Sequence, residues 1–180
     1  CDALALWDGP RDEVLVATKT GYRRTCEAVE ATDGTHAVGA DESRPQSQRL
    51  QAAGSRYGWI ADSRPETMIR DAKESALHLG VDTLDLLYSH GPDPAVPYDG
   101  QCGALKQLLD EGVIKYAGIS RVNNEQIDLA RSIIGSGLVA VQNQFSPSHP
   151  DPEHTMEHCA ELGLAFVCWS PLGGFLDTFD

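Results

Sequence analysis

Short apolar runs alternate with longer amphipathic segments along this chain, and that alternation constrains its fold more than any other feature. The runs carry continuous apolar residues instead of the polar–apolar alternation of a half-exposed strand. Strands of this kind occur in parallel sheets whose faces are covered by helices. The predicted strands are residues 13–18, 85–90, 113–119, 139–142 and 164–169, and the predicted helices are residues 63–79, 104–112, 124–134 and 152–162.

Residues 20–63 interrupt the alternation. This segment is rich in Gly, Ser, Asp and Arg and shows no sustained hydrophobic period. A structureless segment of about 40 residues is unusual inside a compact domain, so we expect a long irregular loop that is either functional or mobile. At its end Ser63 is the predicted N-cap of the following helix, with Glu66 completing a capping box. The 180 residues together are predicted to form one domain, or a part of a larger one.

The charge balance excludes several classes of partner. The chain has 27 acidic against 14 basic residues and a net charge of −13. Nucleic acids and anionic membrane surfaces attract basic proteins, so neither is an expected partner. No apolar run approaches the roughly 20 residues of a membrane span, and a hydrophobic fraction of 41% is enough for a core. The sequence therefore predicts a soluble globular protein, with oligomerisation left open.

The five cysteines point to a reducing compartment. Their number is odd and no pair has the Cys-x-x-Cys spacing. Cys102, Cys159 and Cys168 have apolar neighbours, so buried reduced thiols are expected. The first residues lack the charged start of a secretory signal peptide. These observations favour a cytoplasmic location.

Each predicted strand releases a polar residue at its carboxyl end. These residues are Lys19, His90, Ser120, Gln142 and Ser170. Because the carboxyl ends of parallel strands meet at one edge of a sheet, that edge is the predicted site of chemistry, both in a (β/α)8 barrel and in a doubly wound sheet. No Gly-x-Gly-x-x-Gly fingerprint follows the first strand, which disfavours the doubly wound dinucleotide-binding fold.

The strand ends and their flanks resemble the aldo-keto reductase family. Five stretches occur in the family's order and at similar separations: residues 16–19 (Val-Ala-Thr-Lys), 79–90, 112–120, 141–146 and 169–174. The resemblance implies a (β/α)8 TIM-type barrel of which this chain holds an incomplete set, about five parallel strands with helices outside. It also implies reduction of an aldehyde or ketone, a small-molecule carbonyl substrate, with NADPH by family habit and NADH as an alternative. No metal is implied.

The resemblance assigns two catalytic residues. Lys19 matches the lysine that lowers the pKa of the family's proton-donating tyrosine, and His90 matches the histidine that positions the substrate oxygen. The tyrosine and its aspartate belong to a motif, Asp-Thr-Ala-x-x-Tyr-Gly, expected before the first strand of this chain. Residues 55–58 (Ser-Arg-Tyr-Gly) echo that motif, but they follow Lys19 and lack the aspartate. The 180 residues alone are therefore expected to be a poor or inactive reductase.

The resemblance also assigns cofactor-binding residues. Ser120 and Gln142 match positions that hydrogen-bond the nicotinamide carboxamide, and Trp169 matches the aromatic residue that stacks on the nicotinamide ring. The loop along the pyrophosphate corresponds to Ser170, Leu172 and Gly173. Arg121 departs from the family, where this position is usually asparagine, and arginine offers no acceptor for the carboxamide.

Two other functions are consistent with the sequence. A reductase-like chain can serve as a non-catalytic regulatory or binding subunit. Alternatively, residues 154–158 fit the His-x-x-Glu-His pattern of inverted zinc proteases, with His154 and His158 as ligands and Glu157 as base. The same residues with Glu161 form an ordinary polar stripe on an amphipathic helix, opposite Met156, Cys159 and Ala160. A third ligand is expected well downstream, where the sequence offers only Glu161, Asp177 and Asp180.

Overall fold

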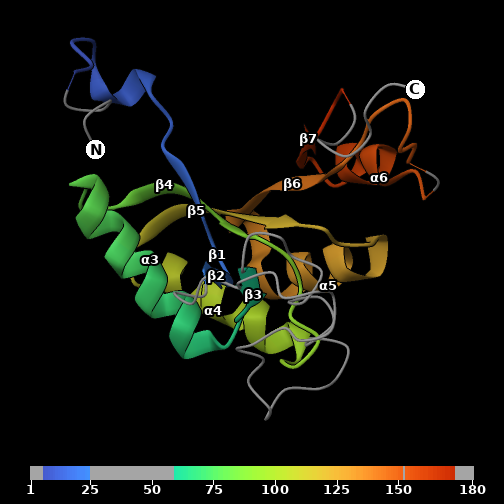
Figure 1. Ribbon diagram of the computed structural model, residues 1–180, viewed down its shortest axis with the longest axis horizontal. Coiled ribbons are helices and arrows are strands. Elements are labelled where there is room, and N and C mark those ends of the chain that lie inside the picture. The colour runs from blue at the N-terminus through green and yellow to red at the C-terminus, as the bar shows by residue number, and fades with distance from the viewer. Residues whose placement is uncertain (1–5, 25–58, 152, 173–180) are drawn as a thin grey trace, which may run out of the picture.

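A parallel five-stranded sheet lies at the centre of the computed structural model, which describes residues 6–24, 59–151 and 153–172 (Figure 1). The strand order β1-β4-β5-β6-β7 follows the order of the chain without a reversal. A doubly wound sheet reverses its strand order at a switch point, whereas a barrel does not. The sheet is therefore an arc of a (β/α)8 barrel, as predicted. Its strands are β1 (Ala17–Thr20), β4 (Leu84–Ser89), β5 (Ile114–Ser120), β6 (Leu138–Gln144) and β7 (Ala165–Trp169).

Helices cover one face of this sheet. They are α3 (Pro65–Leu79), α4 (Tyr98–Asp110), α5 (Asn124–Ile134) and α6 (Thr155–Glu161), and α3 to α5 lie on the same side of the central strands (Figure 1). The main core fills the space between helices and strands, with fully buried side chains such as Met68, Leu87, Leu105, Ile119 and Ile127. Two single turns of 3-10 helix, η1 (Arg11–Glu13) and η2 (Gly135–Gly137), complete the described elements.

The start of α3 differs from the prediction by one residue. Its N-cap is Arg64, without a side-chain capping bond, and Ser63 instead contacts the carbonyl oxygens of Gly21 and Gly91 at 3.4 and 3.5 Å. Pro65 explains the shift, because proline suits the first helical position and holds the residue before it in an extended conformation. The capping box predicted from Ser63 and Glu66 is therefore wrong.

Helix α6 is shorter than its predicted range. His154 adopts a left-handed backbone, φ 52°, so the helix begins only at Thr155. Thr155 and Cys159 form its buried side, whereas the side chain of Met156, expected on the buried side, is 41% exposed. A helix of only seven residues has few buried positions, and in α6 these are Thr155 and Cys159. Met156, one residue after Thr155, therefore lies off the buried side.

The first predicted strand is neither as long nor as buried as expected. Residues 11–13 form η1, and the strand is confined to Ala17–Thr20. Leu15 is 60% exposed, and in β1 only Thr20 is buried. Within the described residues β1 pairs with β4 alone, so one side of it has no neighbouring strand. An apolar run predicts burial only where both sides of a strand are covered.

Two short strands stand at the ends of the segment predicted as irregular. Strand β2 (Tyr22–Arg24) pairs antiparallel with β3 (Trp59–Ala61). Gly21, with φ +93°, turns the chain from β1 into β2, a conformation that glycine adopts without strain. Each strand has three residues, too few for a periodic signal in the sequence. Residues 25–58 lie outside the described part of the chain, so the prediction of an irregular loop there stands as it was.

The inner face of the sheet, opposite α3 to α5, is only thinly covered. A small cluster of Leu86, Tyr88 and Ala140 lies there, while Tyr116 is 46% exposed. Cys168 is exposed as well, which corrects the prediction of a buried thiol, because β7 is the last strand of the described sheet. Cys102 and Cys159 are buried and unpaired, and burial raises the pKa of each thiol to about 11.

A buried carboxylate ties the N-terminal segment to the amino ends of the strands. Asp85 in β4 accepts hydrogen bonds from Arg11 at 2.7 Å, from Lys115 at 2.7 Å and from the backbone N–H of Val16 at 2.9 Å. Burial alone would raise the pKa of Asp85, but these donors hold it well below its usual range. The contacts connect η1 and the chain before β1 to β4 and β5.

In the parts of the chain that the structure describes, no helix is both long and apolar enough to cross a bilayer.

Candidate active site

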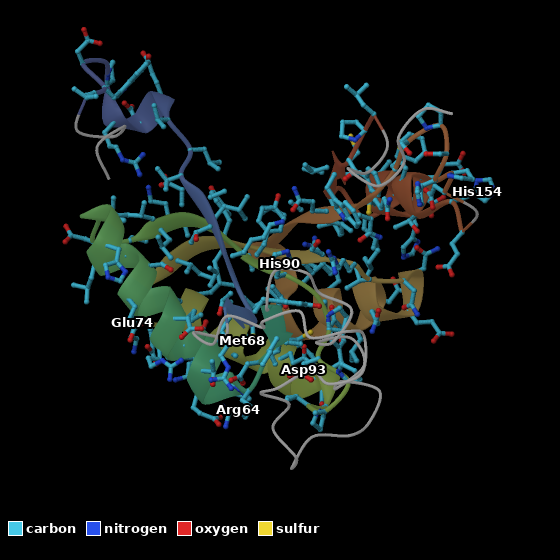
Figure 2. All side chains as sticks on the ribbon, in the orientation of Figure 1. Arg64, Met68, Glu74, His90, Asp93 and His154 are labelled. Atoms are coloured by element: carbon cyan, nitrogen blue, oxygen red, sulfur yellow. The ribbon has the colours of Figure 1, made fainter. Side chains whose placement is uncertain are left out.

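Lys19 in β1 and His90, which directly follows β4, lie side by side at the carboxyl edge of the sheet. Lys19 is in register with Tyr88 of β4, and the backbone N–H of His90 donates to the carbonyl of Thr20 at 2.9 Å. The Lys19 ammonium lies over the Tyr88 ring, 5.9 Å from its centroid. The parallel pairing of β1 with β4 therefore places both predicted catalytic residues at one position of the sheet edge. His90 lies near the centre of the molecule in Figure 2.

Tyr88 can lie beneath Lys19 because β5 carries a glycine next to it. A Cβ atom at Gly118 would come within 2.4 Å of two atoms of the Tyr88 ring, so only glycine leaves room for the ring. Tyr88 is buried, and burial raises the pKa of its hydroxyl. The platform under Lys19 thus depends on the first residue of the Gly-x-Ser sequence in β5.

Burial and like charge perturb both titratable groups. Burial, and then the nearby Arg121 guanidinium, lower the pKa of Lys19. Burial is also the main cause that lowers the pKa of His90 to about 4, with smaller contributions from the charges of Lys19 and Arg121. His90 is therefore a neutral imidazole near pH 7, with one nitrogen as a hydrogen-bond donor and the other as an acceptor.

Arg121, which follows β5, adopts an uncommon backbone conformation. Its φ of 58° lies in the left-handed region that asparagine and glycine tolerate best. Its guanidinium carbon lies 5.1 Å from the centroid of the Trp169 ring and 5.9 Å from that of Tyr22. A Cβ atom at Gly91 would come within 3.3 Å of the Arg121 side chain, so this glycine makes room for it.

Tyr22 is the member of this group that the sequence did not reveal. Its ring centroid is 4.8 Å from that of His90, and it also faces Arg121. The residue falls in the segment predicted as irregular, three positions after Lys19. The only available signal was Gly21, which indicates a sharp turn at the strand end and hence a return of the chain over that edge.

Strands β5 and β6 contribute the predicted cofactor residues. Ser120 donates a hydrogen bond from its hydroxyl to the backbone carbonyl of Gln142 at 2.6 Å. The buried side-chain oxygen of Gln142 and the buried indole nitrogen of Trp169 have no hydrogen-bond partner among the described residues. Buried polar groups normally find partners, so these two atoms fit a ligand that carries both hydrogen-bond donors and acceptors. A nicotinamide carboxamide is such a group.

Asn143 fixes the loop that carries Arg121. Its side-chain nitrogen donates to the carbonyl of Val122 at 2.7 Å, and its side-chain oxygen accepts from the N–H of Val122 at 3.1 Å. Two cavities flank Arg121: one of about 410 Å³ also lined by Tyr22 and Gly91, and one of about 510 Å³ also lined by Asn143 and Trp169. Both have the size of small-molecule pockets.

The loop after β7 is described only in part. Ser170 has a left-handed backbone, φ 53°, and Leu172 is 85% exposed. Gly173, the third predicted residue of this loop, lies outside the described residues. So do residues 55–58, which echo the family's tyrosine motif.

The histidines of the alternative zinc site do not share a helical face. His154 precedes α6 in a left-handed conformation and lies 3.4 Å from Glu157, while His158 lies 2.8 Å from Asp128 of α5. Across the described ranges, no group of three or more His, Cys, Asp or Glu side chains is arranged to hold a metal ion. His154 also lies well away from His90 (Figure 2).

Known proteins resemble this chain in sequence and in fold. An aldo-keto reductase of Strobilurus tenacellus is 34% identical over 118 residues, which cover 63% of this chain and 34% of that protein. A glycerol dehydrogenase of Gluconobacter oxydans has a TM-score of 0.69 at 23% identity, covering 93% of this chain and 42% of its own. An aldo-keto reductase of Bombyx mori, solved in complex with NADP, has a TM-score of 0.63 at 20% identity, covering 98% of this chain and 47% of its own.

The chain thus spans less than half the length of each of these relatives. The structural likeness shows a common fold with the two solved proteins. A model of the aldo/keto reductase family matches residues 2–180, nearly the whole sequence. With the five predicted strands in family order in one parallel sheet, the chain belongs to the aldo/keto reductase family.

Proposed function

We propose that the protein reduces an aldehyde or ketone with a nicotinamide cofactor. The observation that carries this proposal is the position of Lys19 in β1 and of His90 directly after β4, the strand paired with β1, at the same sheet edge as Gln142 and Trp169. Membership of the aldo/keto reductase family, whose members are oxidoreductases that act on carbonyl compounds, supports the same chemistry.

The two predicted catalytic residues have distinct tasks. His90 is neutral near pH 7 because its pKa is lowered to about 4, so it donates a hydrogen bond to the carbonyl oxygen and adds no charge of its own. Lys19 supplies the positive charge that stabilises negative charge developing on that oxygen. A reduced nicotinamide, when bound, supplies a hydride to the carbonyl carbon.

The cofactor residues are those with unused hydrogen-bonding capacity. The side-chain oxygen of Gln142 accepts from the carboxamide nitrogen, and the face of Trp169 packs on the nicotinamide ring. Ser120 holds the backbone of Gln142 in place at 2.6 Å. The residues that we propose for contact with the pyrophosphate are Ser170, Leu172 and Gly173, the last of which lies outside the described part of the chain. We propose NADPH as the preferred cofactor, with NADH also accepted.

The 180 residues alone are proposed to turn over slowly. In the family a tyrosine gives the proton to the developing alkoxide, and general acid catalysis is typically worth about 10²–10⁴-fold in rate. Among the described residues, no tyrosine paired with an aspartate stands beside Lys19. Lys19 and His90 then provide electrostatic help without a tuned proton donor.

A second candidate function is a non-catalytic binding subunit with a reductase-like fold. The exposure of Leu15, Tyr116 and Val167 on the inner face favours it, because this apolar surface is one that a partner would cover. For either function we propose a cytoplasmic protein with no nucleic-acid or membrane partner, and oligomerisation is compatible with both.

The test separates cofactor binding from turnover. NADPH is titrated into the purified chain while tryptophan emission is followed, and consumption of NADPH is then measured with 4-nitrobenzaldehyde. We expect saturable binding and a slow reaction that Lys19→Met and His90→Ala each reduce by roughly 100-fold. The matched controls are Lys73→Met and His78→Ala on α3, which should leave the rate unchanged.

Three results are informative. Loss of the reaction in the two site variants alone supports the reductase. Saturable NADPH binding without turnover across aldehydes and ketones favours the binding subunit. Absence of both binding and turnover contradicts the proposed function.

A further inference from the structure

Two cations at the carboxyl edge of the sheet have no counter-charge among the residues that the structure describes. Among lysine and arginine side chains that the structure describes, only Lys19 and Arg121 meet neither a carboxylate nor a backbone carbonyl. The others pair as follows: Arg11 and Lys115 with Asp85, Arg23 and Arg64 with Asp62, Arg70 with Asp71, Lys73 with Glu111, Lys106 with Asp110, and Arg131 with the carbonyls of Gly135 and Leu138.

The acidic composition of the chain makes the lack of a carboxylate partner for Lys19 and Arg121 among the described residues informative. With 27 acidic residues for 14 basic ones, carboxylates are plentiful, and almost every described cation has found an acceptor. Lys19 and Arg121 instead contact aromatic rings, Tyr88 for the former and Trp169 with Tyr22 for the latter. Arg121 lies close enough to Lys19 to contribute, after burial, to the lowering of the Lys19 pKa, and neither cation is paired with a carboxylate of the described residues.

The backbone of Arg121 adds a second, independent observation. A side chain other than asparagine or glycine at a φ of 58° costs about 1–2 kcal/mol, yet arginine occupies this position. Residues held in such conformations are concentrated at functional sites. Asparagine, the residue usual in the family here, would meet the backbone requirement at lower cost.

The guanidinium of Arg121 is also placed so that its N–H groups can bind an anionic ligand. Its guanidinium carbon lies over the Trp169 and Tyr22 rings, and contacts of this kind with aromatic rings leave the N–H donors of a guanidinium available for a carboxylate or phosphate. The 410 Å³ cavity beside it contains one acidic residue, Asp93. The two carboxylate oxygens of Asp93 accept from the backbone N–H groups of Ser63 and Ala95 at 3.1 and 3.0 Å.

We propose that Arg121 recognises an oxyanion carried by the carbonyl substrate, which makes this site selective for aldehydes and ketones that bear a carboxylate or a phosphate. The inference rests on the proposed function, because it names the substrate class of the same site. Lys19 reinforces the positive potential there, while Arg121 provides the directional contact. The residue that departs from the family pattern is thus the one that sets specificity.

The experiment compares two probes that differ in charge and have the same core. They are 4-carboxybenzaldehyde and its neutral methyl ester, methyl 4-formylbenzoate. Each is titrated into the 15N-labelled chain, and dissociation constants are obtained from the shift of the Trp169 indole N–H signal. The chain has a mass of 19.5 kDa, which suits such spectra, and the measurement needs neither cofactor nor turnover.

We expect the acid to bind about tenfold or more tightly than the ester, as one charge-assisted bidentate contact provides. Arg121→Asn, which suits the left-handed backbone and should fold, is expected to bring the ratio near one. Arg121→Lys keeps the charge without the planar fork and should give an intermediate ratio. Arg70→Asn, an exposed arginine on α3, should keep the original ratio.

A ratio near one in the original chain, or an unchanged ratio in Arg121→Asn, would overturn the proposal. A parallel titration with 2′,5′-ADP tests whether the anion belongs to the cofactor. If Arg121→Asn weakens only 2′,5′-ADP and leaves the acid-to-ester ratio intact, the proposal also fails. A charge preference that depends on Arg121 in a chain that shows no reductase activity would instead support this inference and count against the proposed function.

Discussion

The two edges of the parallel sheet differ in whether their charged side chains are paired. At the amino ends of β4 and β5 the buried carboxylate of Asp85 meets Arg11 and Lys115, each at 2.7 Å. At the carboxyl ends Lys19 and Arg121 stand together with no carboxylate partner among the described residues. The pKa shifts follow this difference, since that of Asp85 is held low by its donors and that of Lys19 is lowered by burial and by Arg121.

This difference indicates which edge serves stability and which serves binding. A compensated buried charge with every oxygen occupied has nothing left to offer a ligand. Uncompensated cations, a strained backbone and buried polar atoms without partners lower stability, and they persist where a ligand completes them. Substitution of the charged residues at the amino edge should therefore change folding, and substitution of the cations at the carboxyl edge should change ligand binding or even raise stability.

The largest effect is expected at the amino edge. Asp85→Asn removes the charge that Arg11 and Lys115 share and weakens the bond to the Val16 N–H. Breaking a buried ion pair from one side typically costs 3–5 kcal/mol, and since both cations are half-exposed we expect about 3 kcal/mol. Urea denaturation of the purified chain measures the loss. Asp71→Asn in α3 removes an ion pair with the exposed Arg70 and should cost no more than about 0.5 kcal/mol. Equal losses in the two variants would contradict the contrast between the edges.

Much of the fold was predictable because helices cover one face of the sheet and its strand β4 is buried throughout. The strands predicted at 85–90 and 113–119 match β4 and β5, and the helix predicted at 124–134 matches α5. The prediction was wrong where local conformation decides: Pro65 moved the start of α3, and the left-handed His154 delayed the start of α6. The first residue of a helix is determined by one or two backbone dihedral angles, and hydrophobic periodicity carries no information about these angles.

The candidate site was predictable only in part. Strand ends place Lys19, His90 and Gln142 at one edge, because parallel strands align their carboxyl ends. The sequence could not place Tyr22, since its contact with His90 depends on the turn at Gly21 and on a three-residue strand. Nor could it show that Arg121 meets aromatic rings and no carboxylate, because ion pairs between distant segments leave no local pattern.

The next effect tests how rigid the carboxyl edge is. Gly118→Ala would bring a Cβ within 2.4 Å of the Tyr88 ring, so the ring must shift or the strands must separate. Overpacking of this kind costs typically 1–3 kcal/mol, and we expect about 2 kcal/mol in urea denaturation. Gly103→Ala in α4 is the matched control: nothing lies within 4 Å of its Cβ position, so the same change should stabilise the chain. If both variants behave alike, Tyr88 is not packed on Gly118 as described.

Substitution of Arg121 is expected to have a smaller effect on stability, and to raise it. Arg121→Asn replaces a residue strained at a φ of 58° by one that tolerates this conformation, and it removes the repulsion on Lys19. The substitution also removes the contacts with Trp169 and Tyr22, which offsets part of this stabilisation. The net expectation is an increase of about 1 kcal/mol in the free energy of unfolding. Arg121→Lys retains both the strain and the charge and should show no gain. A loss of stability in Arg121→Asn would mean that the arginine is structural, like those at the amino edge.

The smallest effect concerns the protonation of His90. Its pKa is lowered to about 4, chiefly by burial and less by Lys19 and Arg121, so Lys19→Met or Arg121→Asn should move it only part of the way back toward 6.5. Between pH 6.5 and about 4 the unfolded chain binds a proton at this histidine and the folded chain does not. The stability that this group contributes is thus complete above pH 6.5 and is lost as the pH falls toward 4. NMR titration of the imidazole measures the pKa directly. A value near 6.5 in the original chain would show that the carboxyl edge is open to water and carries little of the positive potential on which its contrast with the amino edge depends.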